Sequence, residues 1–277
     1  MRWVNYRRWR GGLALAGAMF VGGTGSLRAQ QRAELTVFAA ASLKDAFEDV
    51  ATALARRTPP IAVRYNFAGS QQLVLQLQQG ARADVFASAD ERWMQAARDG
   101  GLVAGTPAIF ARNRLIVITP AANPGRVDRL QDLSRRGLKL VLAAEAVPAG
   151  KYTREALARL AAAPGFGSDY PSRVLRNVVS QEENVKGVVT KVQLGEADAG
   201  IVYVSDVTAA VRHAVRTIEI PEQYNAIATY PIAVLQGTEQ SDAARAFVEF
   251  VLSAEGQGIL ARQGFLPAEA QAMAPGR

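Results

Sequence analysis

Four short stretches could bind an anion, because each places small, hydroxyl or acidic residues just before a predicted helix. Ser42 follows the apolar run 35–39 and opens an amphipathic helix, and Ser70 opens the next one. Residues 147–150 and 182–185 precede two helices in the second half of the chain. The first turn of a helix has backbone N–H groups without partners and a partial positive charge, which favour a bound oxyanion. Four such turns together predict a site for one small anion.

Each of these turns also has a purely structural interpretation. Ser42 with Asp45 three residues later resembles a capping box, so we expect Ser42 to cap its helix as well as to contact the ligand. Ser70 has the same alternative, and Pro148 is common where a helix begins. Acids at 182–183 would interact favourably with a helix dipole. The prediction of an anion site therefore rests on the four turns together and not on any single one.

Catalytic chemistry finds little support in the sequence. The single histidine, His213, is predicted on a surface helix or turn, and the chain has no cysteine, which excludes His/Cys metal sites. Ser42 and Lys44 are two residues apart, whereas the serine-lysine hydrolase motif needs three. There is no Gly-x-Ser-x-Gly elbow and no phosphate-binding loop ending in Gly-Lys-Ser/Thr. We therefore expect a protein that is not an enzyme and has no cofactor or bare metal cation.

The charge distribution points to export. The formal charge of the 277 residues is +7, but residues 1–29 contain five arginines and no acid. The remainder is nearly balanced, so no nucleic-acid surface is predicted. Residues 1–29 resemble a signal peptide, with an Arg-rich start, an apolar run and Ala29 at the cleavage position; a retained membrane anchor is the alternative. Without a cysteine for a lipid anchor, we expect a soluble periplasmic protein.

From residue 34 the hydrophobic pattern alternates between strands and helices, which predicts parallel sheets covered by helices. Two such α/β blocks indicate two lobes with a ligand cleft at the carboxyl ends of the strands. We assign residues 30–111 plus 229–277 to lobe I and 112–228 to lobe II, so the chain crosses between lobes twice. Predicted strands are 35–39, 61–67, 84–88, 115–119, 139–143, 199–204, 215–220 and 230–235; predicted helices are 42–54, 70–77, 90–99, 150–162, the Val185 segment, 242–252 and 255–262, with a loop at 164–171.

Several motifs in this order resemble the periplasmic molybdate-binding proteins of ABC importers. The matches span nearly the whole chain after residue 30, and their combination is more specific than any one of them. They are Val37-Phe38-Ala39-Ala40-Ala41-Ser42-Leu43, Phe67-Ala68-Gly69-Ser70, residues 83–90 (ADVFASAD), Trp93-Met94, residues 147–152 (VPAGKY), Gly200-Ile201-Val202-Tyr203, Tyr230-Pro231-Ile232-Ala233-Val234 and Gly264-Phe265.

The resemblance implies a periplasmic-binding-protein fold that closes on molybdate or tungstate and docks on a membrane permease, as a monomer. Its ligand contacts would be Ser42 and Ser70 through hydroxyl and N–H, Ala149 and Val185 through N–H, and Tyr203 through its hydroxyl. The sequence departs from the family pattern at Gly69 and at Gln71-Gln72, and the match around Val185 is loose.

This set of contacts contains neither a carboxylate nor a lysine or arginine, which suits a fully ionised tetrahedral dianion that needs only hydrogen-bond donors. Sulfate has the same charge and shape, so a receptor for sulfate or another oxyanion is the first alternative. A secreted serine hydrolase that uses Ser42 is a distant one. The effector domain of a regulator is disfavoured, because an export leader occupies the place of a DNA-binding segment.

Overall fold

A computed structural model describes residues 34–268; the predicted signal peptide lies outside these residues. The first of two five-stranded sheets has the order β2-β1-β3-β10-β4. β1 is parallel to β2 and β3, as their alternation with helices predicted, whereas β10 is antiparallel to β3 and β4, so the sheet is mixed. Its strands are β1 (Glu34–Ala40), β2 (Ala62–Ala68), β3 (Val85–Ala87), β4 (Val103–Asn113) and β10 (Ala228–Leu235).

The second sheet has the order β7-β6-β8-β5-β9 and is also mixed. β6 is parallel to β7 and β8, whereas β5 is antiparallel to β8 and β9. Its strands are β5 (Leu115–Pro120), β6 (Leu140–Ala143), β7 (Val178–Glu182), β8 (Ala199–Tyr203) and β9 (Val215–Glu219).

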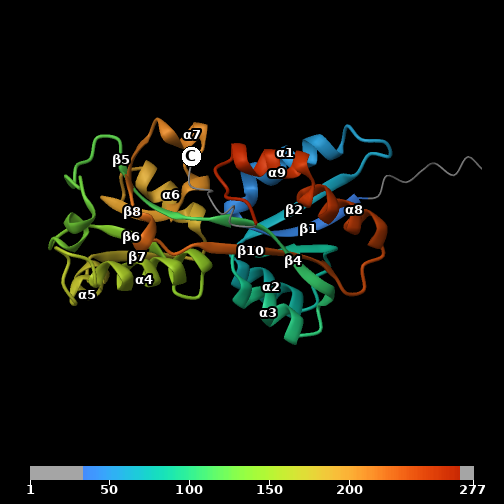
Figure 1. Cartoon of the computed structure of the whole chain (residues 1–277), viewed down its shortest axis with the longest axis horizontal. Helices are drawn as coiled ribbons and strands as arrows, with labels where there is room; N and C mark the ends of the chain where they lie inside the picture. Colours follow the sequence, from blue (N-terminus) through green and yellow to red (C-terminus); the bar gives the residue numbers. More distant parts are fainter. Residues whose placement is uncertain (1–33, 269–277) are drawn as a thin grey trace, which may run out of the picture. The chain divides into compact units, whose positions relative to one another are not determined.

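Helices cover both faces of each sheet, and each sheet with its helices forms one lobe (Figure 1). In the first lobe α1 (Lys44–Leu54), α8 (Ser241–Leu252) and α9 (Ala254–Arg262) cover one face, and α2 (Ser70–Gln78) and α3 (Glu91–Asp99) cover the other. The closing helices therefore return to the first lobe, as predicted. In the second lobe α4 (Pro148–Ala161) and α5 (Tyr170–Leu175) lie on one face, and α6 (Val185–Gln193) and α7 (Ala209–Arg212) on the other.

The chain passes between the lobes at two places. β4 leads directly into β5 after Asn113, and a 3-10 turn, Glu222–Tyr224, separates β9 from β10 on the return. β4 and β10 pair along their lengths and run through the middle of Figure 1. The first-sheet strands thus extend to Asn113 and begin again at Ala228, close to the boundaries proposed from the sequence. The residue limits of the two lobes stay a prediction.

Among the strands and longer helices of residues 34–268, β4, β7 and α5 were not predicted, and each has an irregular pattern. β4 contains Gly105 with a φ of 74° and a proline two residues later, which disguise it as a loop. β7 is half exposed and polar. α5 begins at Tyr170 inside the predicted loop 164–171, because Pro171 is tolerated in the first turn of a helix.

Burial of apolar side chains holds the lobes together as one compact unit. One hydrophobic core contains side chains of both sheets, and a smaller one lies between the first sheet and α2 and α3. Across residues 34–268, no helix combines the length and apolar character needed to cross a membrane.

Candidate functional site

A small cavity lies between the lobes, where both contribute the ends of strands and the starts of helices. Among the described residues that line it, none has a charged side chain. All five residues predicted to contact the ligand lie on its wall. The lining consists of Ala40, Ala41, Ser42, Ala68, Gly69, Ser70, Ala89, Val147, Pro148, Ala149, Asn184, Val185 and Tyr203.

Ser42 occupies a single 3-10 turn, Ala41–Leu43, between β1 and α1. It is buried, and its Oγ lies 3.0 Å from the hydroxyl of Tyr230. The prediction that Ser42 caps α1 was wrong: Leu43 is the N-cap residue, and no side chain caps this helix. The extra turn displaces Ser42 from the capping position, so its hydroxyl contacts Tyr230 and not the first N–H groups of α1.

Ser70 is the first residue of α2, and Gly69 is the N-cap residue, so the interpretation of Ser70 as the cap of this helix was wrong. The Oγ of Ser70 accepts a hydrogen bond of 3.0 Å from the N–H of Ala89, which follows β3. This bond uses an acceptor position of the hydroxyl and leaves its proton available. Ser70 is therefore oriented by its own lobe.

The second lobe contributes the first turns of two helices. α4 begins with Pro148, so Ala149 is its second residue, and α6 begins with Val185. Asn184 caps α6, and its Oδ1 accepts a 3.2 Å hydrogen bond from the N–H of Gly187. N–H groups in the first turn have no partner within the helix, so Ala149 and Val185 supply donors on this wall of the cavity.

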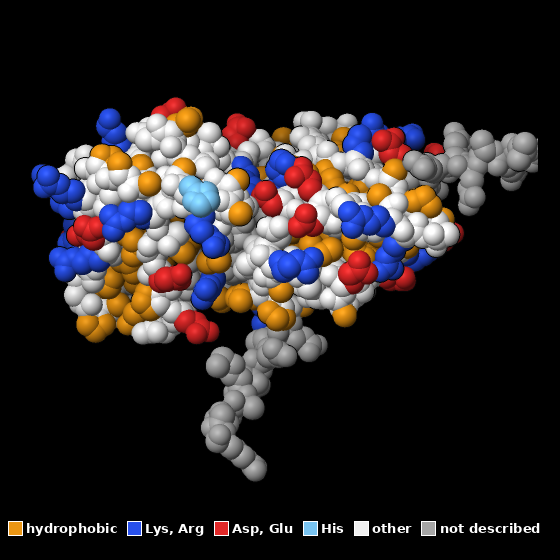
Figure 2. Space-filling model, turned by 90° about the horizontal axis from the view of Figure 1, so that it is seen from above, with side chains coloured by type: hydrophobic (Ala, Val, Ile, Leu, Met, Phe, Trp, Pro, Cys, Tyr) orange, Lys and Arg blue, Asp and Glu red, His pale blue; other side chains and the backbone are white. Residues whose placement is uncertain are grey.

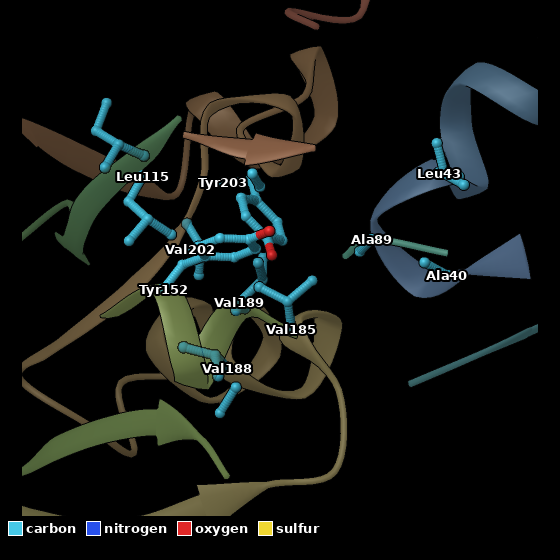
Figure 3. Close-up of a cluster of buried hydrophobic side chains, with 14 of the residues drawn as sticks. Ala40, Leu43, Ala89, Leu115, Tyr152, Val185, Val188, Val189, Val202 and Tyr203 are labelled. Atoms are coloured by element: carbon cyan, nitrogen blue, oxygen red, sulfur yellow. The ribbon is translucent and has the colours of Figure 1, made fainter. Parts of the chain in front are cut away.

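Tyr203 ends β8 and is 1% exposed. Its hydroxyl has no hydrogen-bond partner within residues 34–268. Figure 3 shows the hydroxyls of Tyr203 and Tyr152 together on the side that faces Ala40 and Ala89. Burial, followed by the neighbouring Tyr230, raises the pKa of Tyr203 well above its ordinary value, so the phenol keeps its proton. A buried hydroxyl without a partner is costly, and a ligand in the cavity would remove that cost.

Hydrogen bonds join the lobes on both sides of the cavity. At one side the amide nitrogens of Gln71 and Gln72 donate to the carbonyl and carboxylate oxygens of Glu183, at 2.7 and 2.8 Å. Gly69 lies in the same contact: a Cβ there would be 2.5 Å from the carbonyl oxygen of Glu183. The three residues that depart from the family pattern, Gly69, Gln71 and Gln72, therefore all contact Glu183 of the second lobe.

At the other side two long side chains of α3 reach the second lobe. The indole N–H of Trp93 and the guanidinium of Arg92 both donate to the carbonyl oxygen of Ala146, each at 2.8 Å. Trp93 thus contacts the second lobe and does not line the cavity. These contacts describe a structure in which the lobes are closed.

Lys186, in the first turn of α6, forms an ion pair between the lobes. Its Nζ is 2.8 Å from Asp45 of α1 and 3.3 Å from Asp206, which is fully buried. Burial alone would lower the pKa of Lys186, but the two carboxylates raise it above its ordinary value. Burial raises the pKa of Asp206, and the nearby ammonium opposes this. The pair is next to the cavity but does not line it.

Residues 35–266 match the protein family described as "Bacterial extracellular solute-binding protein". The chain belongs to this family. It is 41% identical over 231 residues to the molybdate-binding protein ModA of Mycobacterium tuberculosis, covering 83% of this chain and 84% of that protein. It is 33% identical over 240 residues to ModA of Escherichia coli, covering 84% and 88%.

A solved solute-binding protein supports the fold. The sulfate-binding protein SubI of Mycobacterium tuberculosis superimposes with a TM-score of 0.77 at 18% identity, over 86% of this chain and 88% of SubI. At this identity the likeness shows the fold alone. The periplasmic-binding-protein architecture predicted from the sequence, with two lobes and two crossings, is therefore confirmed.

The structure brings the five predicted residues to one cavity, and their role as ligand contacts stays a prediction. Sequence reasoning missed the residues that support them. Tyr230 belongs to a motif that carried the family resemblance, but it was given no role, although it lies where β10 returns between the lobes. Asn113, at the other crossing, gave no signal, because its partners are distant in sequence.

Proposed function

We propose that this solute-binding protein binds molybdate, and tungstate with it, in the cavity between the lobes and delivers it to an ABC-type importer. The observation that carries the proposal is the lining: hydroxyls and helix N-termini surround the space, without a charged side chain. A fully ionised dianion accepts from all these donors, whereas a protonated anion such as hydrogen phosphate also needs an acceptor. The molybdate-binding relatives support the same ligand.

The proposed contacts are the hydroxyls and N–H groups of Ser42 and Ser70, the N–H groups of Ala149 and Val185, and the hydroxyl of Tyr203. A hydrogen bond to a charged group contributes roughly 1.5–3 kcal/mol. Several such bonds, offset by the cost of dehydrating the anion and closing the lobes, give a binding free energy of about −8 to −12 kcal/mol. This corresponds to a dissociation constant in the micromolar to nanomolar range.

Calorimetric titration of the purified protein tests this proposal. Molybdate and tungstate are expected to bind with similar affinity, and a hundredfold excess of sulfate is expected to leave the molybdate titration unchanged. Absence of heat and of thermal stabilisation with both anions would refute the proposal.

Sulfate binding is the second candidate, because sulfate is also a tetrahedral dianion and SubI shares the fold. It predicts that sulfate displaces molybdate at equal concentrations. A hydrolase that uses Ser42 has less support. The hydroxyl beside Ser42 belongs to Tyr230, and burial raises the pKa of this phenol, so it is not a base that could activate the serine.

We also propose that the protein acts in the periplasm as a soluble monomer without a lipid anchor. Its direct partners would be the oxyanion and the permease of the importer, and nucleic acid would not be one. On the face shown in Figure 2, basic and acidic side chains are interspersed. Such a mixed surface supports the proposal that nucleic acid is not a partner.

A further inference from the structure

Tyr230 is fully buried on β10, directly behind the cavity wall. The rings of Phe110, Tyr203 and Phe265 surround it at centroid distances of 6.2, 5.9 and 5.4 Å, all close to edge-on. These contacts fix the orientation of the ring. Its hydroxyl is thereby held 3.0 Å from the Oγ of Ser42, a residue on the cavity wall.

Asn113 determines the orientation of the hydroxyl protons of Tyr230 and Ser42. Its Oδ1 accepts the N–H of Arg114 at 3.0 Å, so its other side must be the amide nitrogen. This nitrogen lies 2.8 Å from the Oγ of Ser205 and 3.5 Å from the hydroxyl oxygen of Tyr230. An amide nitrogen only donates, so it occupies an acceptor position of the Tyr230 hydroxyl and directs its proton elsewhere.

The remaining partner of the Tyr230 hydroxyl is Ser42. If Tyr230 donates to Ser42, the serine oxygen accepts, and the serine's own proton is directed toward the cavity. The result is a one-way series of donors from Asn113 through Tyr230 to Ser42. Burial raises the pKa of Tyr230 above its ordinary value, which keeps the phenol protonated.

We propose that Tyr230, held by Asn113, is a positioning residue that fixes Ser42 as a donor and so selects against oxyanions that carry a proton. The inference rests on the proposed function of the cavity and extends it to residues that do not touch the ligand. A ligand O–H placed against Ser42 would meet a proton instead of a lone pair. A deprotonated oxygen at the same place gains a full hydrogen bond.

The test is a double-mutant cycle with Tyr230→Phe and Ser42→Ala, read by calorimetric titration with molybdate. Tyr230→Phe keeps the ring and removes the hydroxyl, so it is expected to weaken molybdate binding about five- to tenfold, the size of one hydrogen bond. In the Ser42→Ala background the same change is expected to alter the dissociation constant less than twofold. If Tyr230 acted through packing alone, Tyr230→Phe would weaken molybdate binding by the same factor in the wild-type and Ser42→Ala backgrounds.

A second titration measures selectivity. With Tyr230→Phe the hydroxyl of Ser42 is free to rotate and accept, so the ratio of phosphate to molybdate dissociation constants is expected to fall at pH 6–7, where phosphate carries protons. Tyr65→Phe is the matched control. It removes a hydroxyl that donates to the Phe47 carbonyl away from the cavity, and both dissociation constants should stay at the wild-type values.

The outcomes separate this inference from the proposed function. If the wild-type protein does not bind molybdate, the function fails. If the wild-type protein binds molybdate, the function stands, and three results would each overturn the positioning role. Tyr230→Phe could bind molybdate with the wild-type affinity, or weaken binding by the same factor with and without Ser42→Ala. It could also leave the ratio of phosphate to molybdate dissociation constants unchanged.

Discussion

The hydroxyls that the two lobes present to the cavity differ in whether the protein already holds them. The first presents the hydroxyls of Ser42 and Ser70, each held by a partner of its own lobe: Tyr230 for one and the N–H of Ala89 for the other. The second presents backbone N–H groups and the hydroxyl of Tyr203, which has no partner within residues 34–268. The first wall is therefore formed before a ligand arrives, whereas the second is completed by it.

The largest effect is expected from removing a backbone donor of the second lobe. Val185→Pro deletes one N–H at the first position of α6, where proline is tolerated, and Asn184 already has the extended backbone that precedes a proline. Losing a hydrogen bond to a charged ligand should weaken molybdate binding about ten- to a hundredfold. Val185→Ala is the control that retains the N–H, and calorimetric titration compares them. Similar affinities for both variants would exclude this N–H as a contact.

A change in the first lobe should affect stability as well as binding. Ser70→Ala leaves the buried N–H of Ala89 without its acceptor, so the free energy of unfolding of the unliganded protein should fall by about 1–3 kcal/mol. Urea unfolding measures this change. Ser172→Ala removes an exposed hydroxyl that donates to Asp169 and should have little effect. If the two variants are equally stable, Ser70 is not held in the way described.

Tyr203→Phe should separate binding from stability. The hydroxyl has no partner to lose, so the melting temperature of the unliganded protein is expected to stay the same or rise slightly, while molybdate binds at least about tenfold more weakly. Tyr170→Phe is the opposite case: its hydroxyl donates to the Leu130 carbonyl, so the melting temperature should fall and the affinity should not. A loss of stability in Tyr203→Phe would contradict the view that the ligand completes this wall.

The smallest effect is expected from pH. Burial raises the pKa of Tyr203 and Tyr230 above the ordinary value of 10.0, so both keep their protons as the pH rises toward that value. The affinity for molybdate should therefore change less than about twofold between pH 7 and 9.5. If the pKa of either tyrosine were instead lowered below 10.0, the phenol would lose its proton within this range and molybdate would bind more weakly. Titrations in three buffers distinguish the two cases.

The sequence predicted the fold and the wall of the cavity well, because both depend on local patterns. Strands that run into helices gave the two lobes, and each predicted contact stands at such a junction. The failures have physical reasons. The 3-10 turn at Ser42 cannot be read from the residues 41–43. β4 and its pairing with β10 depend on residues more than a hundred positions apart. The bonds of Asn113 are equally non-local, so nothing in the chain around it indicates its partners.

The indole of Trp93 has a further consequence for kinetics. Of the three tryptophans in the sequence, the others lie within the first nine residues, in the predicted signal peptide. Trp93 would thus be the single tryptophan of the exported protein, and its N–H donates to a carbonyl of the opposite lobe. Any separation of the lobes must break this bond and expose more of the half-buried indole to water. Rapid mixing followed by tryptophan emission can therefore time the opening and closing of the cleft without an added label.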